Sequence, residues 1–178
     1  MQNNIDQTMV KNNWMEVGEK RVISFSKVAL PYGWLGNMSA YPVKHEGKVY
    51  RTTEALFQSL RFVDFPEVQE MIRAKASPMF AKMVARKHRG LIEGEVERLG
   101  EEDVERMKKC LRMKIEQHGE LKGMLEETGD AVLIEDVGDR RGESDLFWGA
   151  FWVELKDGWS GGNVLGKCWM EIREEMRR

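Results

Sequence analysis

The sequence predicts an α+β protein, a single helix-rich domain with a small antiparallel sheet, and three observations support this fold class. The 178 residues match the length of one domain and are enough to bury a core. Apolar residues recur at helical spacing through much of 53–127 and again through 167–178. Short runs rich in β-branched and aromatic residues supply the strands, near positions 21, 42, 48 and 132.

Charge and composition narrow the possible functions. The chain has 28 basic and 30 acidic residues, so no overall field attracts a polyanion, and nucleic acid is expected only as a modified substrate on a local patch. No apolar run is long enough to cross a bilayer and no secretory leader opens the chain. We therefore expect a cytoplasmic protein without a membrane partner.

Metal and redox chemistry are not expected either. Cys110 and Cys168 lie far apart without CxxC spacing, which indicates reduced structural thiols. The histidines, at positions 45, 88 and 118, are scattered and form no metal-binding motif. We therefore predict that the protein uses neither a metal nor another cofactor.

The N-terminal part of the chain leads into the domain. Residues 1–20 show no sustained pattern and are interpreted as a loosely ordered lead-in, with at most a short helical turn around Trp14. The domain is expected to span 21–178. A first strand is predicted at Arg21–Phe25, which could pair with a hairpin over 42–51 that turns at a Glu-Gly pair.

A helix predicted at 54–63 carries an unusual polar face. Glu54, Gln58 and Arg61 fall at positions i, i+4 and i+7, so they share one side of the helix. A Gly-Asn turn that contains Asn37 precedes the hairpin and helix in the chain. On spacing alone this face is more typical of the solvated side of an amphipathic helix, but it also suits a polar binding site.

Two further helices are predicted at 66–76 and 78–88, and a Ser-Pro pair marks the start of the second. The second helix is expected to turn three apolar residues inward and three basic residues to one side: Phe80, Met83 and Val84, and Lys82, Arg86 and Arg89. Its basic end is either a solvated C-terminus that complements the helix dipole or an anion site.

The longest helical pattern covers 100–127 and is either one core helix or a pair broken near Gly119. A short buried strand is predicted at 131–135, and a charged loop at 136–145 follows it.

The C-terminal part holds a second group of candidate residues. Asp145, Trp148 and Gly149 join a carboxylate, a ring that can stack on a flat ligand, and a glycine, although a buried core tryptophan is the commoner case. A glycine-dense loop at 158–166 precedes a final helix at 167–178 and could offer backbone N–H groups to a phosphate.

Several motifs follow one another in an order that is specific. They are Asn37 with Tyr41-Pro42, Gly47-Lys48-Val49-Tyr50, Thr52-Thr53-Glu54 with Gln58 and Phe62, Ser77-Pro78, Thr128-Gly129, Asp145-x-x-Trp148-Gly149, and Gly161-x-Asn163-x-Leu165-Gly166. Through this order the chain resembles the YbiA-like family, also called NADAR, from Val22 to Met176.

The resemblance implies an N-glycosidase that cleaves C1–N bonds to ribose, in phosphoribosylamino-pyrimidines of riboflavin synthesis or in ADP-ribosyl compounds, without a metal. Such a bond breaks through an oxocarbenium-like transition state that a carboxylate can stabilise. The resemblance makes Glu54 the catalytic residue. The substrate-binding residues it implies are Asn37, Gln58, Arg61, Arg86, Asp145, Trp148, Gly149, Asn163 and Gly166.

Two other functions remain open at this stage. The family's usual His-Tyr after the glutamate is Ala55-Leu56 here, and Ala150 and Gly162 are further departures. These departures suggest a non-catalytic module that binds ADP-ribose or NAD-derived ligands. The basic segment 82–89 suggests instead an ADP-ribosyl hydrolase that acts on modified nucleobases in nucleic acid.

Overall fold

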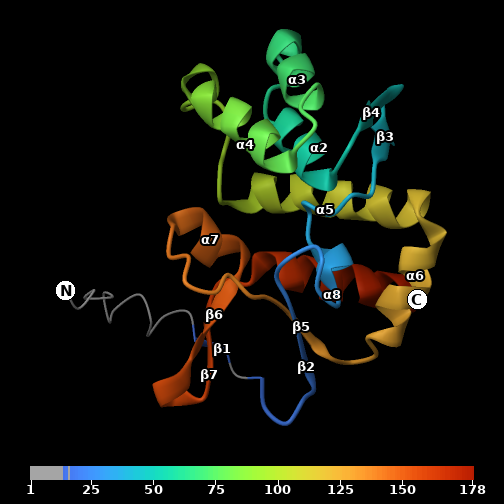
Figure 1. Cartoon of the computed structure of the whole chain (residues 1–178), viewed down its shortest axis with the longest axis vertical. Coiled ribbons are helices and arrows are strands. Elements are labelled where there is room, and N and C mark those ends of the chain that lie inside the picture. The colour runs from blue at the N-terminus through green and yellow to red at the C-terminus, as the bar shows by residue number, and fades with distance from the viewer. Residues whose placement is uncertain (1–13, 16) are drawn as a thin grey trace.

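The computed structural model describes residues 14, 15 and 17–178 (Figure 1). The long helix α5 (Glu101–Gln117) crosses the middle of the molecule. On one side of it lie three helices and a hairpin: α2 (Thr53–Ser59), α3 (Pro66–Arg73), α4 (Pro78–Lys87), β3 (Val43–His45) and β4 (Lys48–Tyr50). The C-terminal helix α8 (Val164–Met176) and the other strands lie on the opposite side.

The strands form three small groups within the described residues. The first is a parallel pair, the second an antiparallel sheet in the order β1-β7-β6, and the third the β3-β4 hairpin. Their remaining bounds are β1 (Trp14–Met15), β2 (Val22–Phe25), β5 (Val132–Glu135), β6 (Ala150–Val153) and β7 (Gly158–Gly161). The connecting elements are η1 (Gly33–Leu35), η2 (Arg89–Ile92), α6 (Gly119–Glu127), α7 (Glu143–Trp148) and η3 (Glu154–Lys156).

The α+β class and the break of the long helical pattern at Gly119 are confirmed, but the predicted pairing of the first strand and the helical turn at Trp14 are wrong. The strand β2 pairs in parallel with β5, with Phe25 opposite Glu135, and does not join the hairpin. Trp14 belongs to β1 and pairs with Ser160, so it forms no helical turn. The remainder of the predicted lead-in up to residue 13 lies outside the described residues.

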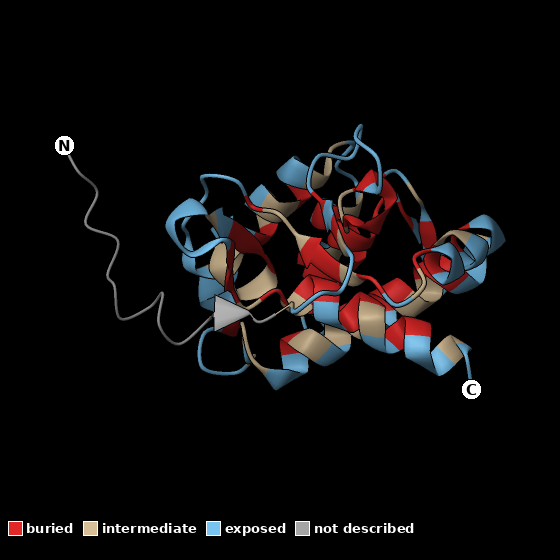
Figure 2. Ribbon diagram, turned by 90° about the horizontal axis from the view of Figure 1, so that it is seen from below, coloured by how far each residue is buried: buried red, intermediate tan, exposed pale blue. Residues whose placement is uncertain are grey.

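The core lies between α5, α8 and the helices α2 to α4, where Figure 2 shows the buried residues gathered. Met107, Leu111 and Ile115 from α5 are buried in it, as the helical spacing predicted. Among the described residues, every helix is too short or too polar to traverse a bilayer.

The helix α4 packs by a different face than predicted. Ala81 and Ala85 are its buried residues, whereas Phe80 and Met83 are more than half exposed and Val84 is partly buried. Small side chains at this contact let α4 approach α2 and α3 closely, so the large apolar residues point outward.

Three other boundaries differ from prediction. The helix α2 ends at Ser59 and leaves Val63 exposed, and α7 forms within the end of the predicted charged loop. The glycine-dense segment 158–166 is no flexible loop, because its first four residues form β7 and α8 begins at Val164. Glycine is depleted in strands, so composition concealed β7.

Gly166 sits where α8 crosses β5. A Cβ atom at this position would overlap the carbonyl oxygen of Leu133 and press on the side chain of Asn163. The absence of a side chain therefore lets helix and strand pack in direct backbone contact.

We predict that Gly166→Ala destabilises the protein by about 1–3 kcal/mol, because the added methyl must push α8 away from β5. The matched control is Gly123→Ala in α6, where no described atom lies within 4 Å of the added Cβ. Alanine there should raise the free energy of unfolding by up to about 1 kcal/mol. Urea unfolding of both variants measures the difference, and equal stabilities would contradict the packing described.

Candidate active site

A cavity of about 380 Å³ lies where the turn at 36–38, the start of α2 and the helix α7 meet, and α4 borders it. The Gly-Asn turn, the Glu54 helix start and the Trp148 segment were each singled out in the sequence. All three contribute to the lining of this cavity.

Asn37 is joined to the start of α2 by three hydrogen bonds. Its carbonyl oxygen accepts from Thr53 Oγ1 at 2.7 Å and from the backbone N–H of Glu54 at 2.8 Å. Its side-chain Nδ2 donates to Glu54 Oε2. The turn and the helix N-terminus therefore form one unit, and that unit positions the carboxylate.

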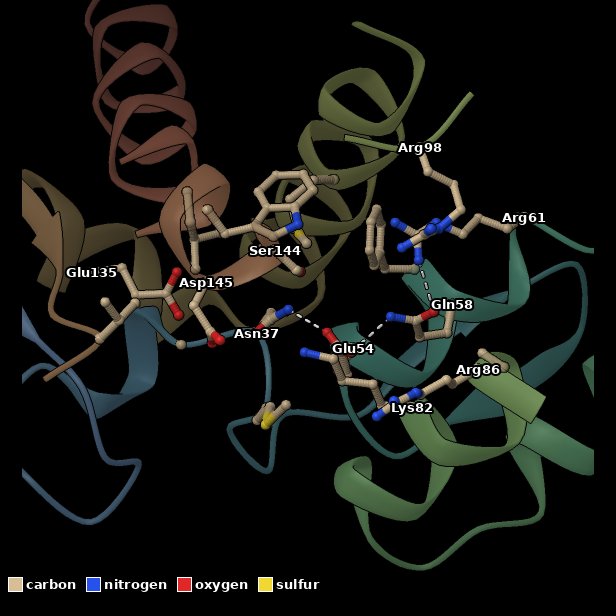
Figure 3. Close-up of a pocket in the computed structure, with 18 of the residues that line it drawn as sticks. Asn37, Glu54, Gln58, Arg61, Lys82, Arg86, Arg98, Glu135, Ser144 and Asp145 are labelled. Carbon is tan, nitrogen blue, oxygen red and sulfur yellow. Dashed lines mark hydrogen bonds between the residues drawn. The ribbon is translucent and has the colours of Figure 1, made fainter. Parts of the chain in front are cut away.

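A chain of side-chain hydrogen bonds continues from Glu54 along α2 (Figure 3). Gln58 Nε2 donates to Glu54 Oε1 at 2.9 Å, and Arg61 Nη1 donates to Gln58 Oε1 at 2.9 Å. The exposed fractions of Glu54, Gln58 and Arg61 are only 2%, 5% and 6%. The interpretation of this face as the solvated side of a helix is therefore wrong.

Arg61 is fixed in turn by Asp103 from the first turn of α5. Its Nε donates to Asp103 Oδ1 at 3.0 Å, and its Nη2 pairs with the other carboxylate oxygen. Burial alone would raise the pKa of Asp103, but the hydrogen bond and charge of Arg61, with smaller contributions from Leu99 and Arg106, hold that pKa below its usual value. The bidentate pair anchors the hydrogen-bond chain in the core.

Lys114 fixes the Gly-Asn turn through hydrogen bonds to its backbone. Its Nζ donates to the carbonyl oxygen of Trp34, to that of Gly36 at 3.2 Å and to Ser39 Oγ at 2.8 Å. The side chain is completely buried, and burial lowers its pKa to about 7. A buried amine thus satisfies the carbonyl groups that this tight turn leaves free.

Basic side chains form one wall of the cavity. Lys82, Arg86 and Arg89 line it from α4 and η2, and Arg98 joins them from the segment before α5. None of these four residues forms an ion pair with a carboxylate of the described chain. The prediction that Lys82, Arg86 and Arg89 share one side of the helix is confirmed. Together with Arg98 they form a region that we call the basic wall.

The opposite side of the cavity carries Glu135, Asp145 and Trp148. Figure 3 shows Glu135 and Asp145 across Glu54 from the arginines. Asp145 pairs with Arg140 at 3.2 Å.

Trp148 is partly buried at the edge of the core and its ring stands edge-on to Phe57 at 5.4 Å between ring centroids.

Three predicted substrate-binding residues do not line the cavity. Asn163 is buried and joins α8 to β5, since its Oδ1 accepts from Glu135 N at 3.0 Å and its Nδ2 donates to Leu133 O at 2.9 Å. Gly149 and Gly166 are sites of close backbone approach, where a Cβ atom would meet β5 or its neighbour Val137. Their positions support the pocket but offer no surface to a ligand.

Three residues of the site had not been singled out in the sequence. Glu135 ends a buried strand, Arg98 lies in a segment without periodicity, and Asp103 follows two other acidic residues in the same helical turn. Only the composition of β5 hinted at Glu135, as the one carboxylate in an otherwise apolar strand. Within the described part of the chain, no group of three or more potential ligands is arranged to hold a metal ion.

Fold and cavity together define an α+β domain with a cavity that holds a buried, hydrogen-bonded carboxylate and a basic wall. The NADAR domain matches residues 24–177, and the chain therefore belongs to the NADAR domain family.

Relatives and a solved structure agree with this assignment. The chain is 35% identical over 162 residues to "N-glycosidase YbiA" of Escherichia coli strain K12, which covers 90% of this chain and 91% of the relative. It is 27% identical over 157 residues to "N-glycosidase Npun_R5314" of Nostoc punctiforme, covering 87% and 92%. The NMR structure of E. coli YbiA matches with a TM-score of 0.65 and 32% identity, over 91% of this chain and 88% of that one.

We predict that Asp103→Asn lowers the free energy of unfolding by about 3 kcal/mol, because it leaves the buried guanidinium of Arg61 without its counter-charge. The difference in unfolding free energy between wild type and variant should be smaller in acid. The wild-type Asp103 has a lowered pKa, and its stabilising charge is lost as the pH falls through that value. Chemical unfolding at pH 7 and pH 3 measures both effects. Glu102→Gln is the control, because Glu102 is an exposed partner of Arg106 and should change stability by less than about 0.5 kcal/mol.

Proposed function

We propose that this protein is an N-glycosidase that hydrolyses the C1–N bond of a ribose-phosphate-bearing substrate, either a phosphoribosylamino-pyrimidine or an ADP-ribosyl compound. One observation carries the proposal: a buried carboxylate, Glu54, is held by two amide side chains at the edge of a cavity that also has a basic wall. The names of the relatives from E. coli and Nostoc support the reaction class.

Glu54 supplies the negative charge that the reaction requires. As the C1–N bond breaks, positive charge develops at C1 and the ring oxygen, and a nearby carboxylate lowers the energy of that state. The same carboxylate accepts a proton from the water that attacks C1. Asn37 and Gln58 each donate to a different carboxylate oxygen, so the group is oriented before substrate arrives.

The basic wall accounts for the phosphate. Lys82, Arg86 and Arg98 face the cavity without a carboxylate partner among the described residues, and guanidinium forks match phosphate oxygens well. Because these cations line one wall of a cavity, they favour a small phosphorylated substrate over a polymer.

The departures from the family pattern fall outside the cavity. Ala55 and Leu56 are buried in the core, and Ala150 and Gly162 are also absent from the cavity lining. The replacements therefore do not remove a polar group from the site, which supports a catalytic protein over a module that only binds ligand.

We predict that Glu54→Gln lowers kcat by about 10²- to 10⁴-fold while substrate affinity and fold persist. The new amide can keep both contacts if its oxygen faces Gln58 and the Asn37 amide turns over, because Arg61 fixes the orientation of Gln58. Release of free base and ribose phosphate from a panel of N-ribosides, followed by mass spectrometry, measures turnover.

The control for this variant is Glu67→Gln, which changes an exposed glutamate in the first turn of α3. It should retain full activity. Full activity of Glu54→Gln would exclude Glu54 as the catalytic residue. Tight ligand binding by the wild type with no product on long incubation would instead select the binding module.

Arg86→Ala should raise KM for a 5′-phosphorylated N-riboside by about tenfold and leave KM for the dephosphorylated riboside unchanged. The reason is that the substitution removes a charged hydrogen-bond donor to the substrate phosphate. Lys87→Ala is the matched control, since it removes a neighbouring positive charge that does not line the cavity. Steady-state kinetics with the two ribosides give the comparison. An equal effect of Arg86→Ala on both ribosides would show that Arg86 does not contact the phosphate.

A further inference from the structure

We infer that Glu135 is a second catalytic carboxyl group, the general acid that protonates the departing nitrogen of the substrate. The inference rests on the proposed N-glycosidase function and assigns a role that Glu54 cannot fill at the same time. It identifies the substrate class more narrowly, as N-glycosides whose leaving nitrogen must gain a proton.

The position of Glu135 gives the first argument. It is the last residue of β5, and its backbone is fixed on both sides, by pairing with β2 and by the hydrogen bond from its N–H to Asn163. Its side chain lines the cavity across Glu54 from Arg86 and Arg98 (Figure 3). A rigid strand end thus presents a carboxyl group on the side where Trp148 offers a ring for the base.

The hydrogen bonding of Glu135 gives the second argument. Its Oε2 is buried, and no hydrogen-bond partner for it exists among the described residues. Buried polar atoms normally have partners, and a catalytic role is one explanation for an exception. By contrast, Asp145 on the same side is paired with Arg140 and is half-buried, so it is the weaker candidate for a proton donor.

The burial of Glu135 keeps a proton on its carboxyl group near neutrality. Burial raises its pKa to about 7, and the charges of Glu54 and Asp145 act in the same direction. The cations Arg140 and Lys82 oppose this rise but do not outweigh it. Glu135 is therefore partly protonated at neutral pH, which suits a general acid.

The proposed step balances as a hydrolysis. The C1–N bond breaks, its electron pair remains on nitrogen, and that nitrogen takes the proton of Glu135. Water bonds to C1 and gives a proton to Glu54, so the products are the free base and ribose phosphate. Transfer of that proton from Glu54 to Glu135, directly or through solvent, restores the starting state.

The test compares two 5′-phosphoribosyl substrates that differ in their need for a proton. The aminopyrimidine nitrogen must be protonated to leave, whereas nicotinamide leaves as a neutral pyridine without a proton. Glu135→Gln should lower kcat by about 100-fold or more on the first substrate and by less than about threefold on the second. Glu54→Gln should impair both, and Glu143→Gln, an exposed glutamate of α7, should impair neither.

The pH profile provides a second readout. Wild-type kcat on the aminopyrimidine substrate should fall tenfold per pH unit above about pH 7, because the acid form of Glu135 is lost there, and this fall should be absent in Glu135→Gln. Carbon-13 NMR of protein labelled at the glutamate carboxyl, assigned with Glu135→Gln, should show a resonance that titrates near pH 7.

The outcomes separate the two proposals. No base release by wild type from either substrate overturns the N-glycosidase function and this inference with it. If the wild type turns over both substrates, two results overturn the role of Glu135 alone. In one, Glu135→Gln lowers kcat equally on both substrates, and in the other it lowers kcat on neither. A Glu135 resonance that titrates near pH 4 does the same.

Discussion

The site depends on one buried amine, that of Lys114. Its amine donates to the carbonyl groups of Trp34 and Gly36 from the middle of α5, and Trp169 of α8 donates from its indole N–H to the carbonyl of Leu35, which lies between them, at 2.7 Å. The two central helices therefore hold consecutive carbonyl groups of one turn. A buried amine is costly unless it is fully hydrogen-bonded, so the turn and the core stabilise each other.

This arrangement couples the position of the Glu54 carboxylate to the packing of the core. The carbonyl of Asn37, next after the fixed segment, accepts from Thr53 and Glu54, and its amide donates to Glu54. Any shift of α5 against α8 would move the turn and with it the carboxylate. A precise position is valuable here because the interaction with a developing positive charge falls off with distance.

The sequence predicted the local features of the site but not the contacts between distant segments. The spacing of Glu54, Gln58 and Arg61 gave their common face, and the helical period of 78–88 placed three cations on one side. Spacing could not show that the Glu54 face is buried, because the cause is Asp103, which lies 42 residues beyond Arg61. The β7 strand was missed because its glycines have low strand propensity. Their value to the strand is close contact with a distant segment, which the local sequence does not show.

The buried pair with Asp103 also changes what Arg61 can do. The family resemblance made Arg61 a candidate for substrate binding, but its guanidinium donates to both oxygens of Asp103 and to Gln58, and it lies 4.4 Å over the ring of Phe57. With its donors committed, Arg61 is better suited to fix the Gln58 amide so that the nitrogen, and not the oxygen, faces Glu54. In the proposed reaction, the phosphate is then left to the unpaired basic wall. A substrate bound in the proposed way would place its ribose at Glu54 and its base toward Trp148 and Glu135.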